Sequence, residues 1–326
     1  MSEGSVSEGN ISEGNISEGN ASEGNASGGN ASGGSTSGGS TSGGSTRGGS
    51  TRGGNVGRGN GSGGNGDAAR LFSGVGVALV TIFGPDGAVD EAATARHAAD
   101  LARRGMRVVL VAGTTGEAGK LTDGERVGLI RAVRAALPDD VPVLAGTGAA
   151  SADGAVRLTK TAVEAGADGV LAYPPPDWDS GAHPDLPAFY AAVAKAAAGK
   201  PVLAYHVPWV SSPGVPVESL PKLPVAGIKD SSGSADRLLD ELTHYAGATY
   251  VGSSALLALA GPMGGAGAIL AIANVEPELC SAAFAGDGGA QLRLAPTHLA
   301  VRTGGPAELK RLLAGRGDFP ATSRLA

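Results

Sequence analysis

The residue of this chain best suited to covalent chemistry is Lys229, which ends the apolar run 225–228 and precedes Asp230-Ser231-Ser232-Gly233. Burial disfavours the charged form of an amine. A neutral lysine amine can attack a ketone and form a Schiff base. No other lysine of the chain directly follows an apolar run that reads as a strand. Taken alone, the motif also fits a lysine at a strand end that extends its charged head to water.

Two further polar motifs follow apolar runs. Gly113-Thr114-Thr115-Gly116-Glu117 comes after the run 107–112. Its glycines allow a tight turn, and its amides and two hydroxyls can hold a carboxylate, while Glu117 is expected to brace the loop rather than react. Tyr205 ends the run 202–205, and a phenol near a Schiff-base lysine can transfer protons. Each motif alone also fits an ordinary turn or a tyrosine at a core boundary.

The elements that must position these residues are short apolar runs alternating with helical stretches. The strands are expected at residues 76–82, 107–112, 141–146, 169–173, 201–205, 225–229, 248–252 and 267–271. The helices are expected at 91–104, 123–137, 152–165, 186–198, 217–220, 235–245, 254–260 and 307–313. Strands without alternating polar residues indicate a parallel sheet that is covered on both sides.

Eight such units in a chain of this length predict the α/β class and a closed (β/α)8 TIM barrel, which typically needs about 250 residues. No Gly-X-Gly-X-X-Gly sequence follows the first expected strand, which argues against an open dinucleotide-binding sheet. Chemistry in such barrels gathers at the carboxyl ends of the strands. Thr114-Thr115, Tyr205 and Lys229 all fall there, so the topology is expected to bring them to one face.

Residues 1–66 differ in composition from the rest of the chain. They repeat pentads such as Ser-Glu-Gly-Asn-Ile and Arg-Gly-Gly-Ser-Thr and contain almost no large apolar side chain. This low-complexity composition predicts a disordered tail. Residues 67–326 are then expected to form the catalytic barrel domain with a short C-terminal helical region.

Charge and cysteine content disfavour several classes of function. The formal net charge of −6 gives no general attraction to nucleic acid. No apolar stretch is long and charge-free enough to read as a membrane span. One cysteine, Cys280, and five histidines without metal-ligand spacing lead us to expect no metal. With no apolar signal segment before the repeats and no paired cysteines, a cytoplasmic protein is expected.

Together, the three motifs resemble the signatures of a known family. Gly113-Thr-Thr-Gly-Glu, Tyr205-His-Val-Pro and Gly227-Ile-Lys-Asp-Ser-Ser-Gly look like those of the dihydrodipicolinate synthase and N-acetylneuraminate lyase family, and the likeness spans residues 73–280. The resemblance implies a class I aldolase or synthase, a carbon–carbon lyase that uses no metal and no cofactor beyond a covalent imine. Its partners would be a 2-oxo acid and an aldehyde, and its assembly a homo-oligomer, either a dimer or a tetramer.

The resemblance also implies a role for particular residues. Lys229 would form an imine with pyruvate or another 2-oxo acid, and Tyr205 would relay protons. Thr114 and Thr115 would hold the carboxylate of the oxo acid. The implied backbone lining of the same pocket comes from Gly252 and Ile269.

The chain departs from the family pattern in two places. The synthases carry Thr-Pro-Tyr-Tyr after the fourth strand, and one of these tyrosines completes a proton relay across a subunit interface. Here the stretch is Tyr173-Pro174-Pro175-Pro176, with Tyr173 out of register. The synthases also place an arginine soon after the strand-five motif to bind the carboxylate of the aldehyde, where this chain has Trp209-Val210-Ser211-Ser212. With Asp177 adding negative potential, a neutral or sugar-like aldehyde is favoured over aspartate semialdehyde.

Three hypotheses follow from these observations. The first is a Schiff-base lyase or aldolase that joins or splits pyruvate, or a related 2-oxo acid, and an aldehyde. The second is 4-hydroxy-tetrahydrodipicolinate synthase in lysine biosynthesis. The third is a catalytically silent barrel that binds a 2-oxo acid. The altered relay supports the third, whereas the retention of Lys229, Tyr205 and Thr114-Thr115 argues against it.

Overall fold

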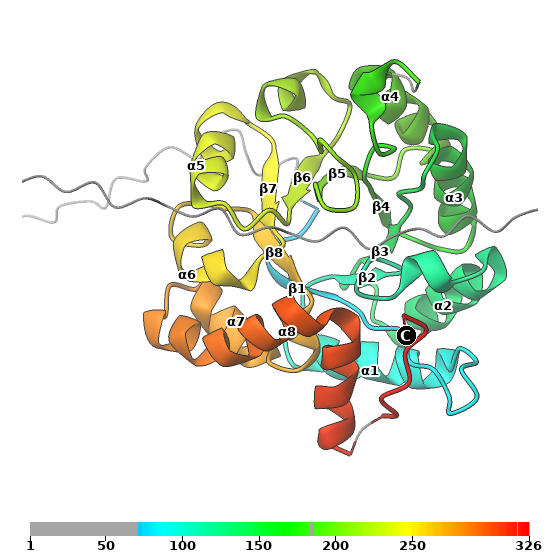
Figure 1. Cartoon of the computed structure of the whole chain (residues 1–326), viewed down its shortest axis with the longest axis vertical. Coiled ribbons are helices and arrows are strands. Elements are labelled where there is room, and N and C mark those ends of the chain that lie inside the picture. The colour runs from blue at the N-terminus through cyan, green and yellow to red at the C-terminus, as the bar shows by residue number, and fades with distance from the viewer. Residues whose placement is uncertain (1–70, 183–184, 318, 326) are drawn as a thin grey trace, which may run out of the picture. The chain divides into compact units, whose positions relative to one another are not determined.

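The computed structural model describes residues 71–182, 185–317 and 319–325. Within them, eight parallel strands pair in sequence order and β1 also pairs with β8, so the sheet closes into a barrel (Figure 1). The predicted TIM barrel of the α/β class is therefore confirmed. The tail expected at residues 1–66 lies outside the described residues.

The strands are short and almost wholly buried. They are β1 Gly74–Ala78, β2 Val109–Val111, β3 Val143–Gly146, β4 Gly169–Ala172, β5 Val202–His206, β6 Gly227–Asp230, β7 Ala248–Val251 and β8 Gly267–Leu270. The first strand ends earlier than the apolar run 76–82 predicts. After it, the amides of Val80 and Ile82 bond to the side chains of Asn274 and Thr94, and not to a neighbouring strand. A buried apolar run thus continues past the point where the ladder stops.

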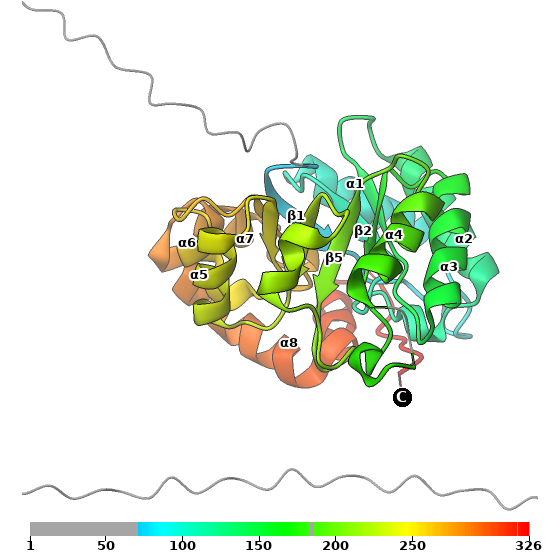
Figure 2. The same cartoon turned by 90° about the horizontal axis from the view of Figure 1, so that it is seen from above.

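The helices surround the barrel. They are α1 Glu91–Arg103, α2 Asp123–Ala136, α3 Ala152–Glu164, α4 Leu186–Ala196, α5 Ala235–His244, α6 Leu257–Ala260, α7 Pro277–Phe284 and α8 Gly288–Gly315. Figure 2 shows α2, α3 and α4 on one side of the strands and α5, α6 and α7 on the other. Side-chain oxygens cap the starts of many helices by accepting hydrogen bonds from backbone amides of the first turn. These caps are Asp90, Thr122, Ser151, Asp185, Ser234 and Asp287.

Short 3₁₀ turns supplement the helices. They are η2 Ala118–Lys120, η3 Trp178–Ser180, η4 Val217–Lys222, η5 Ser254–Leu256 and η6 Ile272–Asn274. None of the helices described combines the length and the apolar character that a membrane crossing requires.

Helix α8 is much longer than the expected helix at 307–313. The glycines at 288, 289 and 304 weaken the helical signal in the sequence, because glycine lowers helix propensity. The chain nevertheless stays helical on both sides of Gly305, whose φ of 58° and ψ of −147° produce a kink. The second half of α8 carries Lys310, which is almost fully buried.

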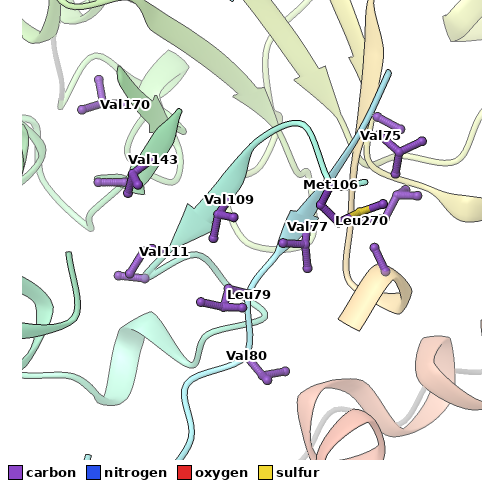
Figure 3. Close-up of a cluster of buried hydrophobic side chains, with 14 of the residues drawn as sticks. Val75, Val77, Leu79, Val80, Met106, Val109, Val111, Val143, Val170 and Leu270 are labelled. Atoms are coloured by element: carbon purple, nitrogen blue, oxygen red, sulfur yellow. The ribbon is translucent and has the colours of Figure 1, made fainter. Parts of the chain in front are cut away.

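Two apolar layers hold the barrel together. Outward-facing strand residues pack against the helices, and Figure 3 shows Val77, Val109, Val111, Val143 and Val170 among them. Inward-facing residues fill the barrel; this interior cluster includes Leu110, Leu144, Leu171, Leu203, Tyr205, Tyr250 and Ile269. Neighbouring residues of one strand face opposite layers, as the period of two along a strand requires. The same alternation decides which strand-end residues reach the interior.

Candidate active site

Lys229 lies on β6 beside Tyr205 on β5. The two residues are register partners on neighbouring strands, and the lysine Nζ lies over the tyrosine ring, 4.6 Å from its centre. Both side chains are buried, with Lys229 only 3% exposed. Ile228 packs in the outer layer, so the alternation along β6 turns Lys229 toward the barrel interior. The amine and the phenol expected to work together are therefore neighbours.

The Tyr205 phenol is held in a polar environment. The Ser231 hydroxyl donates a hydrogen bond to Tyr205 Oη at 3.3 Å. Burial alone raises the pKa of Tyr205. The positive charge of Lys229 and hydrogen bonding with Ser231, Thr114 and Lys229 outweigh that effect and bring the pKa below its usual value. Such a phenol gives up its proton more readily than a free tyrosine.

A cavity of about 210 Å³ opens at this end of the barrel. It is smaller than the roughly 300–1,000 Å³ clefts that hold drug-sized ligands, so it suits a small substrate. Its walls come mainly from the carboxyl ends of β2 to β5. The lining residues are Ala112, Gly113, Thr114, Glu117, Ala118, Gly119, Gly146, Gly148, Leu171, Tyr173, Tyr205, Val210 and Leu325.

The loop after β2 forms a tight turn on the cavity wall. The amides of Gly116 and Glu117 donate to the carbonyls of Gly113 and Thr114, each at 3.0 Å. Glu117 has a left-handed backbone with a φ of 56°. Thr114 is exposed toward the cavity, whereas Thr115 is 9% exposed and does not line it. The structure thus places one of the two threonines directly on the cavity wall.

Gly252 lies at the same end of the barrel as Lys229, and Ile269 lies in the barrel interior. Neither residue lines the cavity. The Gly252 amide donates to the Asp230 carbonyl at 2.6 Å. A Cβ atom at Gly252 would lie 2.0 Å from Ser231 Oγ, so a larger residue here would displace the hydroxyl that bonds Tyr205. Ile269 is fully buried on β8 in the interior cluster that contains Tyr205. Lys229 is also not among the residues that line the cavity, but its amine lies over the ring of Tyr205, which does.

Comparison with known proteins identifies the family to which this site and fold belong. Residues 71–295 match the model of the dihydrodipicolinate synthetase family. A 4-hydroxy-tetrahydrodipicolinate synthase from Salinibacter ruber is 36% identical over 214 residues, which cover 64% of this chain and 70% of the relative. One from Thioalkalivibrio sulfidiphilus is 33% identical over 227 residues, covering 67% of this chain and 76% of the relative.

The solved structures agree. The chloride-inhibited dihydrodipicolinate synthase from Acinetobacter baumannii, complexed with pyruvate, has a TM-score of 0.70 and 26% identity, covering 78% of this chain and 92% of its own. The chain belongs to the dihydrodipicolinate synthetase family. It is an enzyme, a carbon–carbon lyase of the class I aldolase type.

In this member of the family, Tyr173 occupies the cavity wall. Its ring centre lies 6.4 Å from that of Tyr205. A Cβ atom at Gly148 would lie 2.3 Å from the Tyr173 ring, so glycine is what leaves room for it. Burial raises the pKa of Tyr173, against the lowering effect of the Arg126 charge. The sequence showed a tyrosine at the end of the strand-four run, but not the space that Gly148 leaves for its ring.

A buried charged network lies next to Lys229 in this enzyme. Asp230 accepts hydrogen bonds from the amide and the hydroxyl of Ser232, at 2.7 and 2.9 Å. Arg237 lies 3.6 Å from Asp230 and 3.0 Å from Glu241. Burial raises the pKa of Glu241 to about 8, and the charge of Asp230 adds to this effect. The polar residues after Lys229 thus shape the turn and tie it to α5.

His206, at the end of β5, is also part of this region. The Val215 amide donates to its Nδ1 at 3.0 Å. Burial lowers the pKa of His206 to about 4, and the positive charge of Arg237 adds to this effect. The imidazole is therefore neutral near pH 7 and serves as an acceptor that fixes the loop after β5.

The family's charged partner for a second carboxylate has no counterpart on the described cavity wall. Among the described lining residues none is a lysine, an arginine or a histidine. In the loop after β5, Trp209 is 66% exposed and the Ser211 hydroxyl donates to the Pro174 carbonyl at 2.5 Å. Asp177 is absent from the lining, so the expected negative potential at the mouth does not come from this side chain at the wall.

Glu117 braces its loop, as expected from the sequence. Its carboxylate forms an ion pair with Lys310 of α8, and both side chains are shielded from water. The Arg324 amide donates to the other carboxylate oxygen at 2.7 Å. These partners could not be predicted from the sequence, because they lie 193 and 207 positions away. The part of the chain that the structure describes contains no cluster of three or more His, Cys, Asp or Glu side chains able to hold a metal ion.

Proposed function

We propose that this enzyme joins or splits pyruvate, or a related 2-oxo acid, and an aldehyde through an imine on Lys229. The observation that carries the proposal is the position of Lys229 Nζ, 4.6 Å from the centre of the Tyr205 ring, at the buried carboxyl ends of β5 and β6. The Acinetobacter baumannii relative is complexed with pyruvate, which supports the same oxo acid here.

The chemistry follows from these two groups. The neutral amine of Lys229 attacks the ketone carbon of pyruvate and gives a carbinolamine, which loses water to form the imine. Loss of a proton from the neighbouring methyl carbon then gives an enamine, whose carbon attacks the aldehyde carbonyl. Hydrolysis of the new imine releases the product and restores the amine. Tyr205 transfers protons in the carbinolamine and carbon–carbon bond steps.

The remaining site residues bind and shape the substrate. We assign Thr114 and Thr115, with the amides of their loop, to the carboxylate of the oxo acid, because hydroxyl and amide donors can hold this group. Thr114 lines the cavity, which supports its part in binding. Gly252 and Ile269 contribute backbone around the imine, supported by their location in the same barrel.

A neutral aldehyde is the preferred second substrate in this proposal. The described cavity wall offers no cation to an additional carboxylate, and its one carboxylic acid, Glu117, is already paired with Lys310. The names of the relatives favour a second candidate, 4-hydroxy-tetrahydrodipicolinate synthase of lysine biosynthesis. The third hypothesis, a silent barrel, loses support because Lys229 and Tyr205 are in contact.

The proposal extends to the setting of the enzyme. We place it in the cytoplasm, with small-molecule substrates and no nucleic-acid or membrane partner, in keeping with its net charge of −6 and its small cavity. We also propose a homo-oligomer, either a dimer or a tetramer, on the family resemblance.

The test is a comparison of kcat/KM for the condensation of pyruvate with D-glyceraldehyde and with L-aspartate semialdehyde, in one buffer and at one salt concentration. This ratio reports differential binding of the two transition states. The proposal expects glyceraldehyde to react faster. A clear preference for aspartate semialdehyde would establish the synthase instead, and no reaction with either aldehyde or in the reverse direction would support the silent barrel.

A further inference from the structure

The chain returns to the cavity at its last described residues, 319–325, here called the return segment. Leu325 lines the cavity together with Thr114 and Tyr205. Figure 1 shows this part of the chain, in red, running past α1 to lie beside α2. Two contacts agree with this path, since the Phe319 ring meets His97 of α1 edge-on at 5.2 Å and Arg324 binds Glu125 of α2.

Arg324 anchors the return segment through its whole guanidinium group. Its Nη2 and Nη1 donate to the two carboxylate oxygens of Glu125 at 2.7 and 3.1 Å, and this partner lowers the pKa of Glu125 to about 2. Nη1 and Nε also donate to the carbonyls of Lys120 and Gly87, at 3.0 and 2.8 Å. The guanidinium carbon lies 4.5 Å from the centre of the Phe83 ring. These bonds fix the backbone next to Leu325.

The return segment is also tied to the loop that carries the threonines. The backbone amide of Arg324 donates to Glu117, and Glu117 follows Thr114-Thr115-Gly116 directly. The side chain of Glu117 therefore holds both the return segment and the loop proposed to bind the substrate carboxylate. Lys310 completes this arrangement from α8.

Leu325 itself is not a core residue. It is 46% exposed, so it gains little from burial, yet the anchored residue before it holds it at the cavity. At this position an isobutyl group removes water from part of the cavity wall and offers no hydrogen bond. A carboxylate next to it would lose hydration without gaining a partner.

We propose that Leu325 is a specificity-determining residue, an apolar wall that selects against an aldehyde carrying a carboxylate. The inference rests on the proposed function and deepens it by naming the residue that sets the class of the second substrate. Arg324 is the positioning residue that holds this wall.

The test places a cation at the wall. Leu325→Arg and Leu325→Lys are compared with the wild-type enzyme, and Leu292→Arg on α8 is the matched control, since Leu292 is 75% exposed and does not line the cavity. For each protein kcat/KM is measured with pyruvate and either L-aspartate semialdehyde or D-glyceraldehyde, together with the thermal midpoint. Trapping of pyruvate by borohydride is measured on the wild-type enzyme in parallel.

We expect either cationic variant at position 325 to raise the ratio of kcat/KM for aspartate semialdehyde over glyceraldehyde at least tenfold, with no change in the control. A merely structural role would lower both values together and leave the ratio unchanged. A ratio within twofold of the wild type in a folded position-325 variant, or an equal rise in Leu292→Arg, overturns the inference. Two cationic variants are used so that the failure of one to fold leaves the other to decide. Absence of pyruvate trapping in the wild type would instead overturn the proposed function.

Discussion

The amine of Lys229 and the ring of Tyr205 face each other across the β5–β6 pair, with 4.6 Å between the nitrogen and the ring centre. Strand register produces this contact, because neighbouring parallel strands bring the residues at their carboxyl ends side by side. The positive charge favours the ionised phenol, and hydrogen bonding between the phenol hydroxyl and Lys229 places the hydroxyl next to the amine. The following predictions test the parts of this arrangement separately.

Replacing Tyr205 by phenylalanine is expected to lower kcat for condensation by a factor of about 10² to 10⁴, the range typical of losing a general acid or base. The hydroxyl is removed while the ring beneath Lys229 is kept, so pyruvate is still trapped by borohydride, though more slowly. Steady-state kinetics and trapping rates check this. Tyr245→Phe is the control, because Tyr245 lies at the end of α5 and does not line the cavity. Wild-type kcat in Tyr205→Phe would remove the phenol from the mechanism.

The stability of the enzyme is expected to fall between about pH 4.5 and pH 8 because of Glu241. Its pKa in the folded state is about 8, above the ordinary value of 4.5, so the folded chain binds more protons than the unfolded chain across this window. Stability is therefore lost as pH rises, by about 5 kcal/mol at most. Glu241→Gln should remove this loss and raise the free energy of unfolding at pH 8 but not at pH 4.5. Denaturant titrations at several pH values check this.

A suitable control for Glu241 is Glu164→Gln at the exposed end of α3, which should leave the pH dependence unchanged. The assignment would be contradicted if the free energy of unfolding of the wild-type enzyme rose from pH 5 to pH 8 and Glu241→Gln abolished that rise. It would mean that Arg237, 3.0 Å from Glu241, keeps the carboxylate ionised in the fold.

Replacing only one member of the buried ion pair between Lys310 and Glu117 is expected to destabilise the fold. Lys310→Met leaves an unpaired carboxylate with no contact to water and should lower the free energy of unfolding by about 3–5 kcal/mol. The double variant Lys310→Met/Glu117→Gln should lose less than the sum of the two single variants. Arg311→Met is the matched control, since Arg311 pairs with Glu308 on the exposed side of the same helix. Additive losses in the double variant would show that the pair does not act as a unit.

The fold could be predicted largely because each barrel unit leaves a local pattern. Apolar runs without polar alternation mark the buried parallel strands, and the helical stretches between them mark the covering helices. Lys229, Tyr205 and Thr114 could be named as site residues because each directly follows or ends such a run. In the barrel, the ends of successive strands meet by topology alone.

The rest depends on contacts between distant residues, which leave no periodic signal. Lys310 and Arg324 meet Glu117 from 193 and 207 positions away. Tyr173 enters the cavity wall because Gly148, on the neighbouring loop, leaves space for its ring. The length of α8 was underestimated because its glycines weaken the helical pattern in the sequence, whereas tertiary packing stabilises the helix. Such features are set by tertiary packing, so only the structure shows them.

The central claim is that Lys229 forms an imine with pyruvate, and borohydride reduction followed by peptide mass spectrometry tests it most directly. The account predicts a reduced pyruvate adduct on Lys229 and on no other lysine, and no adduct in Lys229→Ala. Efficient labelling of Lys229→Ala, or labelling of the wild-type enzyme centred on Lys120, which lies at the exposed end of η2 near the same cavity, would contradict it.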